Sequence, residues 1–149
     1  MLKRFLILGL VALLCSLSLS ACNDGGGDHD IDPADLPATA LSFLSTYFPG
    51  DAIWTAEKDG NDYTVLLESG CEVDFVADGT WDDIDARTAA LSSKVTSLLP
   101  SAARKYVEGN YPGVGISEID REPYGYKVDL LNGLELKFDA SGNFLSVDD

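Results

Sequence analysis

The sequence repeats itself at an offset of 63 residues. Residues 63–81, YTVLLESGCEVDFVADGTW, align without a gap with residues 126–144, YKVDLLNGLELKFDASGNF. When residues 36–85 are compared with residues 99–148, 15 of 50 positions are identical, where average composition gives roughly 3 by chance. A duplication is the economical explanation, and we expect two half-sized units of the same kind.

Each copy predicts a two-stranded antiparallel hairpin with one buried face. Apolar and polar residues alternate on both sides of a turn at Gly70 or Gly133, and this period of two is typical of a half-buried strand. The side chains expected to point into the core are Tyr63, Val65, Leu67, Cys71, Val73 and Phe75 in the first copy and Tyr126, Val128, Leu130, Leu134, Leu136 and Phe138 in the second.

A short amphipathic helix is expected before each hairpin, over residues 37–48 and 100–111. A proline stands at its first turn, and Pro-Gly follows its end, as is common at helix boundaries. A closing strand at 81–85 or 144–148 completes each copy, so the chain is expected to be α+β, with tandem αβββ(β) repeats forming one antiparallel sheet. The first strand of each repeat is expected to contain a bulge, because its apolar residues are spaced by three: Ile53 and Ala56, then Ile116 and Ile119.

The N-terminus has the form of a secretory signal over residues 1–21. Lys3 and Arg4 precede an apolar run of about 15 residues, which is shorter than the roughly 20 needed to span a bilayer as a helix. The tetrapeptide LSAC that ends at Cys22 resembles the lipobox of bacterial lipoproteins. This resemblance implies cleavage before Cys22 and attachment of lipid to its thiol, which would tether the protein to a membrane.

The segment after the signal is rich in Gly and Asp and nearly devoid of apolar side chains, which predicts a flexible acidic tether. Its aspartates alternate as at the start of a calcium loop, but Pro33 and Thr39 stand where such a loop needs Gly and Glu. The pattern leaves open whether the linker between the repeats is a short helix or an extended segment. The expected boundaries are signal peptide 1–21, tether 22–35, first repeat 36–85, linker 86–98 and second repeat 99–149.

The chain is strongly acidic. It contains 25 acidic and 10 basic residues, and loss of Lys3 and Arg4 with the signal leaves 8 basic residues and a net charge of −17. Repulsion from phosphates therefore excludes nucleic acid as a partner. An acidic surface commonly serves only to keep an exported protein soluble. The alternative is that the acidic surface attracts a basic protein patch or divalent cations.

Period two also places side chains on the sheet face opposite the predicted core. This face is expected to show six carboxylates, two lysines and two leucines, and a nearby tryptophan adds an aromatic anchor of the kind that dominates interface energies. The alternative is the ordinary solvated face of a half-buried sheet. The candidate partner-binding residues are Trp54, Leu66, Glu68, Glu72, Asp74, Lys127, Asp129, Leu131, Glu135 and Lys137.

No catalytic residue, metal site or cofactor is predicted. His29, the only histidine, lies in the expected tether, so neither a Ser/His/Asp nor a zinc-type arrangement can form on the folded part. Acids on an open sheet are expected to keep ordinary pKa values, because no pocket encloses them. Cys71 and Trp81 align with Leu134 and Phe144, so both are expected in the core, with the thiol unpaired.

Several short motifs occur twice in tandem behind the lipobox: Leu-Pro, Pro-Gly, Tyr-x-Val-x-Leu, Gly-x-Glu-x-x-Phe and Asp/Ser-Gly-x-aromatic. In this combination the chain resembles the PepSY-like proteins, also called beta-lactamase-inhibitor-like proteins. The resemblance implies an α+β domain with one antiparallel sheet, helices packed on one face and the other face free as a binding surface. It also implies that catalytic residues are absent.

Three functional hypotheses follow. The first is a non-enzymatic, lipid-anchored protein of the bacterial envelope, on the periplasmic side or the outer-membrane surface, which binds a protein partner through the open acidic face. In one version it inhibits that partner. The second is a divalent-cation or small-ligand binder that uses the clustered acids. The third is a passive structural lipoprotein.

Overall fold

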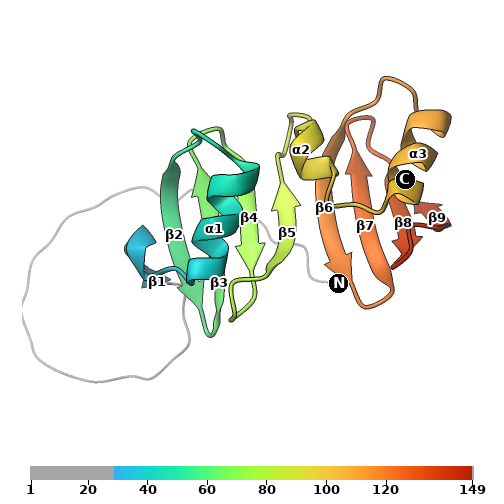
Figure 1. Ribbon diagram of the computed structural model, residues 1–149. Helices are drawn as coiled ribbons and strands as arrows, with labels where there is room; N and C mark the ends of the chain where they lie inside the picture. The colour runs from blue at the N-terminus through green and yellow to red at the C-terminus, as the bar shows by residue number, and fades with distance from the viewer. Residues whose placement is uncertain (1–28, 149) are drawn as a thin grey trace, which may run out of the picture.

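The computed structural model describes residues 29–148, whose strands form one antiparallel sheet (Figure 1). Each strand pairs with its neighbours in the chain, so the order in the sheet runs from β1 to β9. The predicted α+β class and the single antiparallel sheet are confirmed. The elements are β1 (His29–Asp30), the 3-10 helix η1 (Pro33–Asp35), α1 (Ala38–Tyr47), β2 (Ile53–Asp59), β3 (Asp62–Leu67), β4 (Glu72–Phe75), β5 (Trp81–Asp85), α2 (Ser93–Thr96), α3 (Ser101–Asn110), β6 (Ile116–Glu122), β7 (Gly125–Leu130), β8 (Glu135–Asp139) and β9 (Phe144–Asp148).

The two halves of the sheet share one order of elements. Helix α1 is followed by β2 to β5, and α3 is followed by β6 to β9, and each of the second five elements begins 63 residues after its counterpart. Prolines precede both helices as N-caps, at Pro37 and Pro100. The hydrophobic spacing therefore predicted both helices to within one residue at each end.

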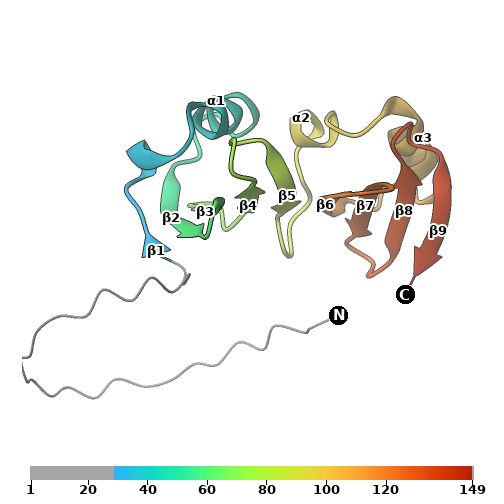
Figure 2. The same ribbon diagram turned by 90° about the horizontal axis from the view of Figure 1, so that it is seen from below.

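The helices lie on one side of the sheet, and the core lies between the two layers. In Figure 2 the α-helices lie on the upper side of the sheet, and none of the helices in residues 29–148 lies on the face below. Ala40 and Leu44 of α1 and Ala103 and Val107 of α3 are buried against the sheet. Burial of this apolar face supplies the main driving force for folding.

Both predicted hairpins form with the predicted face inward. Val65 pairs with Val73, and Val128 pairs with Leu136, and all four side chains are fully buried. Tyr63, Tyr126 and Leu134 are half-buried and pack against the same core. The predicted bulges are also present, because the register of both first strands shifts, between Ile53 and Thr55 and between Ile116 and Glu118.

The two halves meet where β5 pairs with β6. Ile84 lies opposite Ile119 in this junction, and both side chains are fully buried. The linker 86–98, whose conformation the sequence left open, contains the four-residue helix α2 flanked by irregular backbone. Its Leu91 and Val95 are buried in the shared core, so the linker belongs to the fold.

The predicted tether 22–35 is wrong for its last seven residues. His29 and Asp30 pair with Lys58 and Glu57 at the edge of β2, and the Ile31 N–H donates to the Ala56 carbonyl oxygen at 2.9 Å. Residues 33–35 form η1. Backbone hydrogen bonds to an open strand edge order this segment, and composition does not reveal them.

Cys71 occupies the predicted inward position. Its side chain is buried and unpaired among the described residues, and burial, followed by nearby carboxylates that include Asp85 and Asp51, raises the pKa of the thiol to about 12. Trp81, expected in the core, is half-buried, stacks on Phe43 and packs against the core. Neither residue has the environment of a nucleophile or ligand.

Two predictions fall on the N-terminal part of the chain. The signal peptide 1–21 and the lipidation site Cys22 lie outside the described residues. Between residues 29 and 148, none of the helices has the length and apolar character needed to cross a bilayer.

Candidate acidic binding site on the outer face

The sheet face turned away from the helices, here called the outer face, carries an unbroken row of carboxylates. From β4 to β9, cross-strand pairing places one acidic residue of each strand beside an acidic residue of the next. Paired strands lie about 4.8 Å apart, so these like charges stand side by side. The acidic row consists of Glu72, Asp85, Glu118, Asp129, Glu135 and Asp148.

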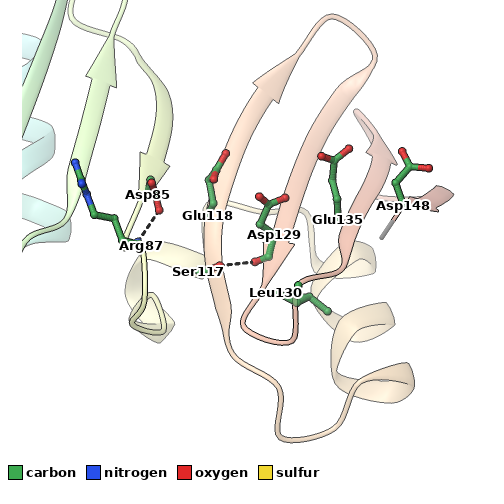
Figure 3. A pocket seen from close by; sticks show the side chains of 9 residues that line it. Asp85, Arg87, Ser117, Glu118, Asp129, Leu130, Glu135 and Asp148 are labelled. Carbon is green, nitrogen blue, oxygen red and sulfur yellow. Dashed lines mark hydrogen bonds between the residues drawn. The ribbon is translucent and has the colours of Figure 1, made fainter. Parts of the chain in front are cut away.

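A depression of about 370 Å³ follows the row, and Figure 3 shows five of its carboxylates on the same side of the sheet. Basic side chains pair with the two ends of the row. The Arg87 guanidinium lies 2.9 Å from Glu72, and the Lys137 ammonium lies 3.1 Å from Glu135 and 2.5 Å from Asp148. These pairs are partly exposed, so each is expected to contribute little to stability.

The tightest group of acids lies at the junction of the two halves. Asp83 of β5 stands opposite Asp120 of β6, and Glu118 lies two residues before Asp120. One carboxylate oxygen from each of these three residues lies within 4.8 Å of the other two. We call Asp83, Glu118 and Asp120 the junction cluster.

One lysine reaches the junction cluster from β7. The Lys127 Nζ lies 2.8 Å from Glu118 Oε1 and 3.0 Å from Asp120 Oδ2. Burial alone would lower the pKa of this ammonium, but the hydrogen bonds to the two carboxylates outweigh burial and raise it. Lys127 is therefore charged at neutral pH and supplies one positive charge beside three carboxylates.

Two acids of this region hold their protons unusually tightly. Burial, followed by the charges of Glu118 and Asp120, raises the pKa of Asp83 to about 8. Burial, followed by the charge of Glu118, raises the pKa of Asp129 to about 6. One oxygen of Asp83 and one of Asp129 are buried and accept no hydrogen bond within residues 29–148. Such atoms gain from a ligand that can pair with them.

The structure gathers six charged residues among the ten candidates on the outer face in two neighbouring rows, and Leu66 extends the first row. Trp54 is exposed to 70% of its surface at the bulge of β2, away from the junction cluster in strand order. Leu66 is half-buried opposite Glu72. The six gathered residues are Glu72, Asp129 and Glu135 of the acidic row and Asp74, Lys127 and Lys137 of the next row.

Three expectations about this surface need correction. Glu68 and Leu131 lie in turns, because their strands end at Leu67 and Leu130, so the alternation of a strand no longer applies to them. Acids on this sheet do not all keep ordinary pKa values, since Asp83 is half-buried beside other carboxylates.

The sequence reasoning also missed the residues at the junction. Asp83, Asp85, Glu118 and Asp120 lie on the strands that join the halves, whereas the candidates came mainly from the hairpins. A signal was present, because acids flank an isoleucine in both DID (83–85) and EID (118–120). The same period of two that defined the hairpins assigns those acids to the outer face.

Within residues 29–148, the fold and this face define an α+β protein with one acidic sheet surface that no helix covers. The chain matches the family model described as "Putative beta-lactamase-inhibitor-like, PepSY-like" over residues 27–73 and 61–146. It therefore belongs to the PepSY-like family. The two matches overlap in the first hairpin, as tandem copies of one unit would do.

Solved structures from Bacteroides share this fold. A "putative periplasmic protein of unknown function" from Bacteroides vulgatus ATCC 8482 is 32% identical, with a TM-score of 0.75 over 83% of this chain and 100% of that chain. A "putative calcium-regulated periplasmic protein" from Bacteroides thetaiotaomicron is 28% identical, with a TM-score of 0.75 over 82% and 97%. A second Bacteroides vulgatus structure, a "putative periplasmic protein", is 30% identical, with a TM-score of 0.74 over 87% and 100%. No curated protein matches the chain.

Because the pKa of Asp83 is raised, the stability of the folded chain should depend on pH. Its pKa is about 8 in the folded chain and about 3.9 in an unfolded one, so the stabilisation from the protonated carboxyl is complete below the unfolded pKa and is lost as pH rises through the folded pKa. Each pKa unit is worth about 1.4 kcal/mol. The free energy of unfolding of Asp83→Asn, relative to that of wild type, should therefore rise by at least about 2 kcal/mol from about pH 5 to about pH 8.5. Urea unfolding measures this difference.

The matched control is Asp59→Asn, which removes an exposed acid from β2 of the same sheet. The change with pH should be larger for Asp83→Asn than for this control. An equal change in both variants would show that burial does not shift the titration of Asp83.

Proposed function

We propose that this chain is a non-enzymatic protein of the bacterial cell envelope that binds a divalent cation of the size of calcium at the junction cluster. The observation that carries the proposal is the convergence of carboxylate oxygens from Asp83, Glu118 and Asp120 within 4.8 Å of one another. Carboxylates at this separation repel one another when all are ionised, so a bound divalent cation would turn an unfavourable arrangement into a favourable one.

The size of the cluster fits calcium. Calcium binds carboxylate oxygens at 2.3–2.6 Å, so two of its ligands lie at most about 5 Å apart. Magnesium binds oxygens at 2.0–2.1 Å, which limits its ligands to about 4.2 Å unless the side chains move. The three oxygens of the junction cluster lie within 4.8 Å of one another, which is inside the limit for calcium.

The present counter-charge is incomplete. Lys127 contacts Glu118 and Asp120, but one oxygen of Asp83 remains buried without a partner among residues 29–148. Asp83 holds its proton because ionisation there is costly. Binding of a cation would lower that cost, release the proton and occupy the unpaired oxygen.

Similarity to known proteins adds support. The Bacteroides thetaiotaomicron structure, 28% identical to this chain, carries the description "putative calcium-regulated". Three similar structures are described as periplasmic, which supports an envelope location for this chain. A lipid on Cys22 would hold the folded part at a membrane surface.

Titration calorimetry tests the proposal. Calcium chloride added to the purified chain at about pH 7.5 should saturate one site with a Kd between about 10 µM and 1 mM, the range of weak sensors and extracellular sites. Asp120→Asn should weaken binding at least about tenfold, because it removes one ligand charge. Asp59→Asn is the matched control and should bind as wild type does. Dilution heats alone, or equal binding by Asp120→Asn, would exclude the site.

A second candidate function is binding of a basic protein partner, with inhibition of that partner as one form of it. The unbroken acidic row favours this candidate, because complementary charge steers association and fixes register. Replacing Glu72, Asp74 and Glu135 with Lys should abolish affinity capture of the partner from native envelope, with little change in melting temperature. Capture that survives the charge reversal would remove the outer face as the docking surface. A passive structural lipoprotein should show neither calcium binding nor specific capture.

A further inference from the structure

Strand β9 forms one edge of the sheet and exposes apolar side chains there. Strands β1 and β9 lie at opposite ends of the strand order, as Figure 1 also shows. Strand β9 has five residues, and its Leu145 and Val147 are exposed to 51% and 43%. A long strand edge with exposed apolar side chains readily pairs with another strand unless charge or a cover prevents it.

The β5–β6 junction shows how the last strand of one repeat pairs with the first strand of the next. Strand β5, the counterpart of β9, pairs with β6 through Asp83–Asp120, Ile84–Ile119 and Asp85–Glu118. Shifted by 63 residues, the same register would place β9 of one copy against β2 of another. The equivalent pairs are Ser146 with Glu57, Val147 with Ala56, and Asp148 with Thr55.

Strand β1 already occupies this place on β2. Asp30 pairs with Glu57, and Ile31 donates its N–H to the carbonyl of Ala56. Residues 30 and 31 therefore lie on β2 as residues 83 and 84 lie on β6, and both pairs begin the tripeptide Asp-Ile-Asp. The N-terminal segment is a short substitute for the last strand of a repeat.

We infer that β9 of one copy pairs with β2 of a second copy in the register of the β5–β6 junction, and that β1 is the strand it displaces. The contact is head to tail, so it joins copies into open chains rather than closed dimers. The partner is a second copy of this protein, and the inference is independent of the proposed cation site.

The proposed contact between copies brings together fewer carboxylates than the β5–β6 junction does. Two of its three pairs, Ser146 with Glu57 and Asp148 with Thr55, bring one carboxylate each. The internal junction tolerates two carboxylates in the corresponding pairs. Val147 would take the place beside Ala56 that Ile31, which packs against the core, occupies now. Because β1 is attached to the same chain, its high effective concentration keeps dilute copies apart.

A cysteine pair tests the register directly. In the full-length chain, Ser146→Cys with Glu57→Cys places two thiols at neighbouring positions only if β9 of one copy lies beside β2 of another, since these strands are far apart within one sheet. Mild oxidation at high protein concentration should give dimers and longer ladders on a non-reducing gel. Each single variant, which keeps the native cysteines, is the control. Absence of ladders above the single variants would overturn the inference.

A second pair of variants tests the role of β1. Ile31→Pro removes the N–H that bonds to Ala56 and the side chain that packs on the core, and it should increase self-association in analytical ultracentrifugation at least about threefold. Adding Val147→Lys should return the chain to monomer, because it places a charge at the edge.

Leu131→Lys is the matched control, since it changes an equally exposed apolar residue away from β9 and should not reduce association. A monomeric Ile31→Pro variant, or association that Val147→Lys does not reverse, would overturn the inference.

Discussion

The pairing of β5 with β6 is the interaction on which the rest of the structure depends. It joins the two halves into one sheet, buries Ile84 against Ile119, and lets the linker cover the seam with Leu91 and Val95. The same pairing forces acids together on the outer face, because side chains alternate along a strand. One register therefore produces both the apolar seam of the core and the acidic surface opposite it.

This register brings carboxylates close enough to repel one another. Two features of the junction cluster reduce that repulsion. Asp83 stays protonated up to about pH 8, and Lys127 pairs with Glu118 and Asp120. Both adjustments reduce repulsion without removing the acids from the surface. A divalent cation would perform the same task with greater charge and would couple the stability of the central seam to its concentration. This coupling is what gives the acidic face a functional meaning.

The sequence predicted the features that local patterns determine. Alternation around Val65 and Val73 predicted the inward face of the first hairpin because both strands belong to one continuous stretch. It could not predict that Asp83 faces Asp120, because the neighbour of β5 depends on how the two halves dock. The raised pKa of Asp83 depends on the same docking. The order in residues 29–35 comes from hydrogen bonds to the edge of β2, and a polar composition gives no sign of them.

The most direct measurement is the thermal stability of Lys127→Met with and without calcium. In EDTA the variant should lose about 1–3 kcal/mol, because the carboxylates of Glu118 and Asp120 remain without their counter-charge. Calcium at millimolar concentration should restore most of that loss and should stabilise the variant more than wild type, because the cation no longer competes with an ammonium. If calcium stabilises neither protein, or if Lys127→Met is as stable as wild type in EDTA, the junction cluster is not a site whose charge must be balanced.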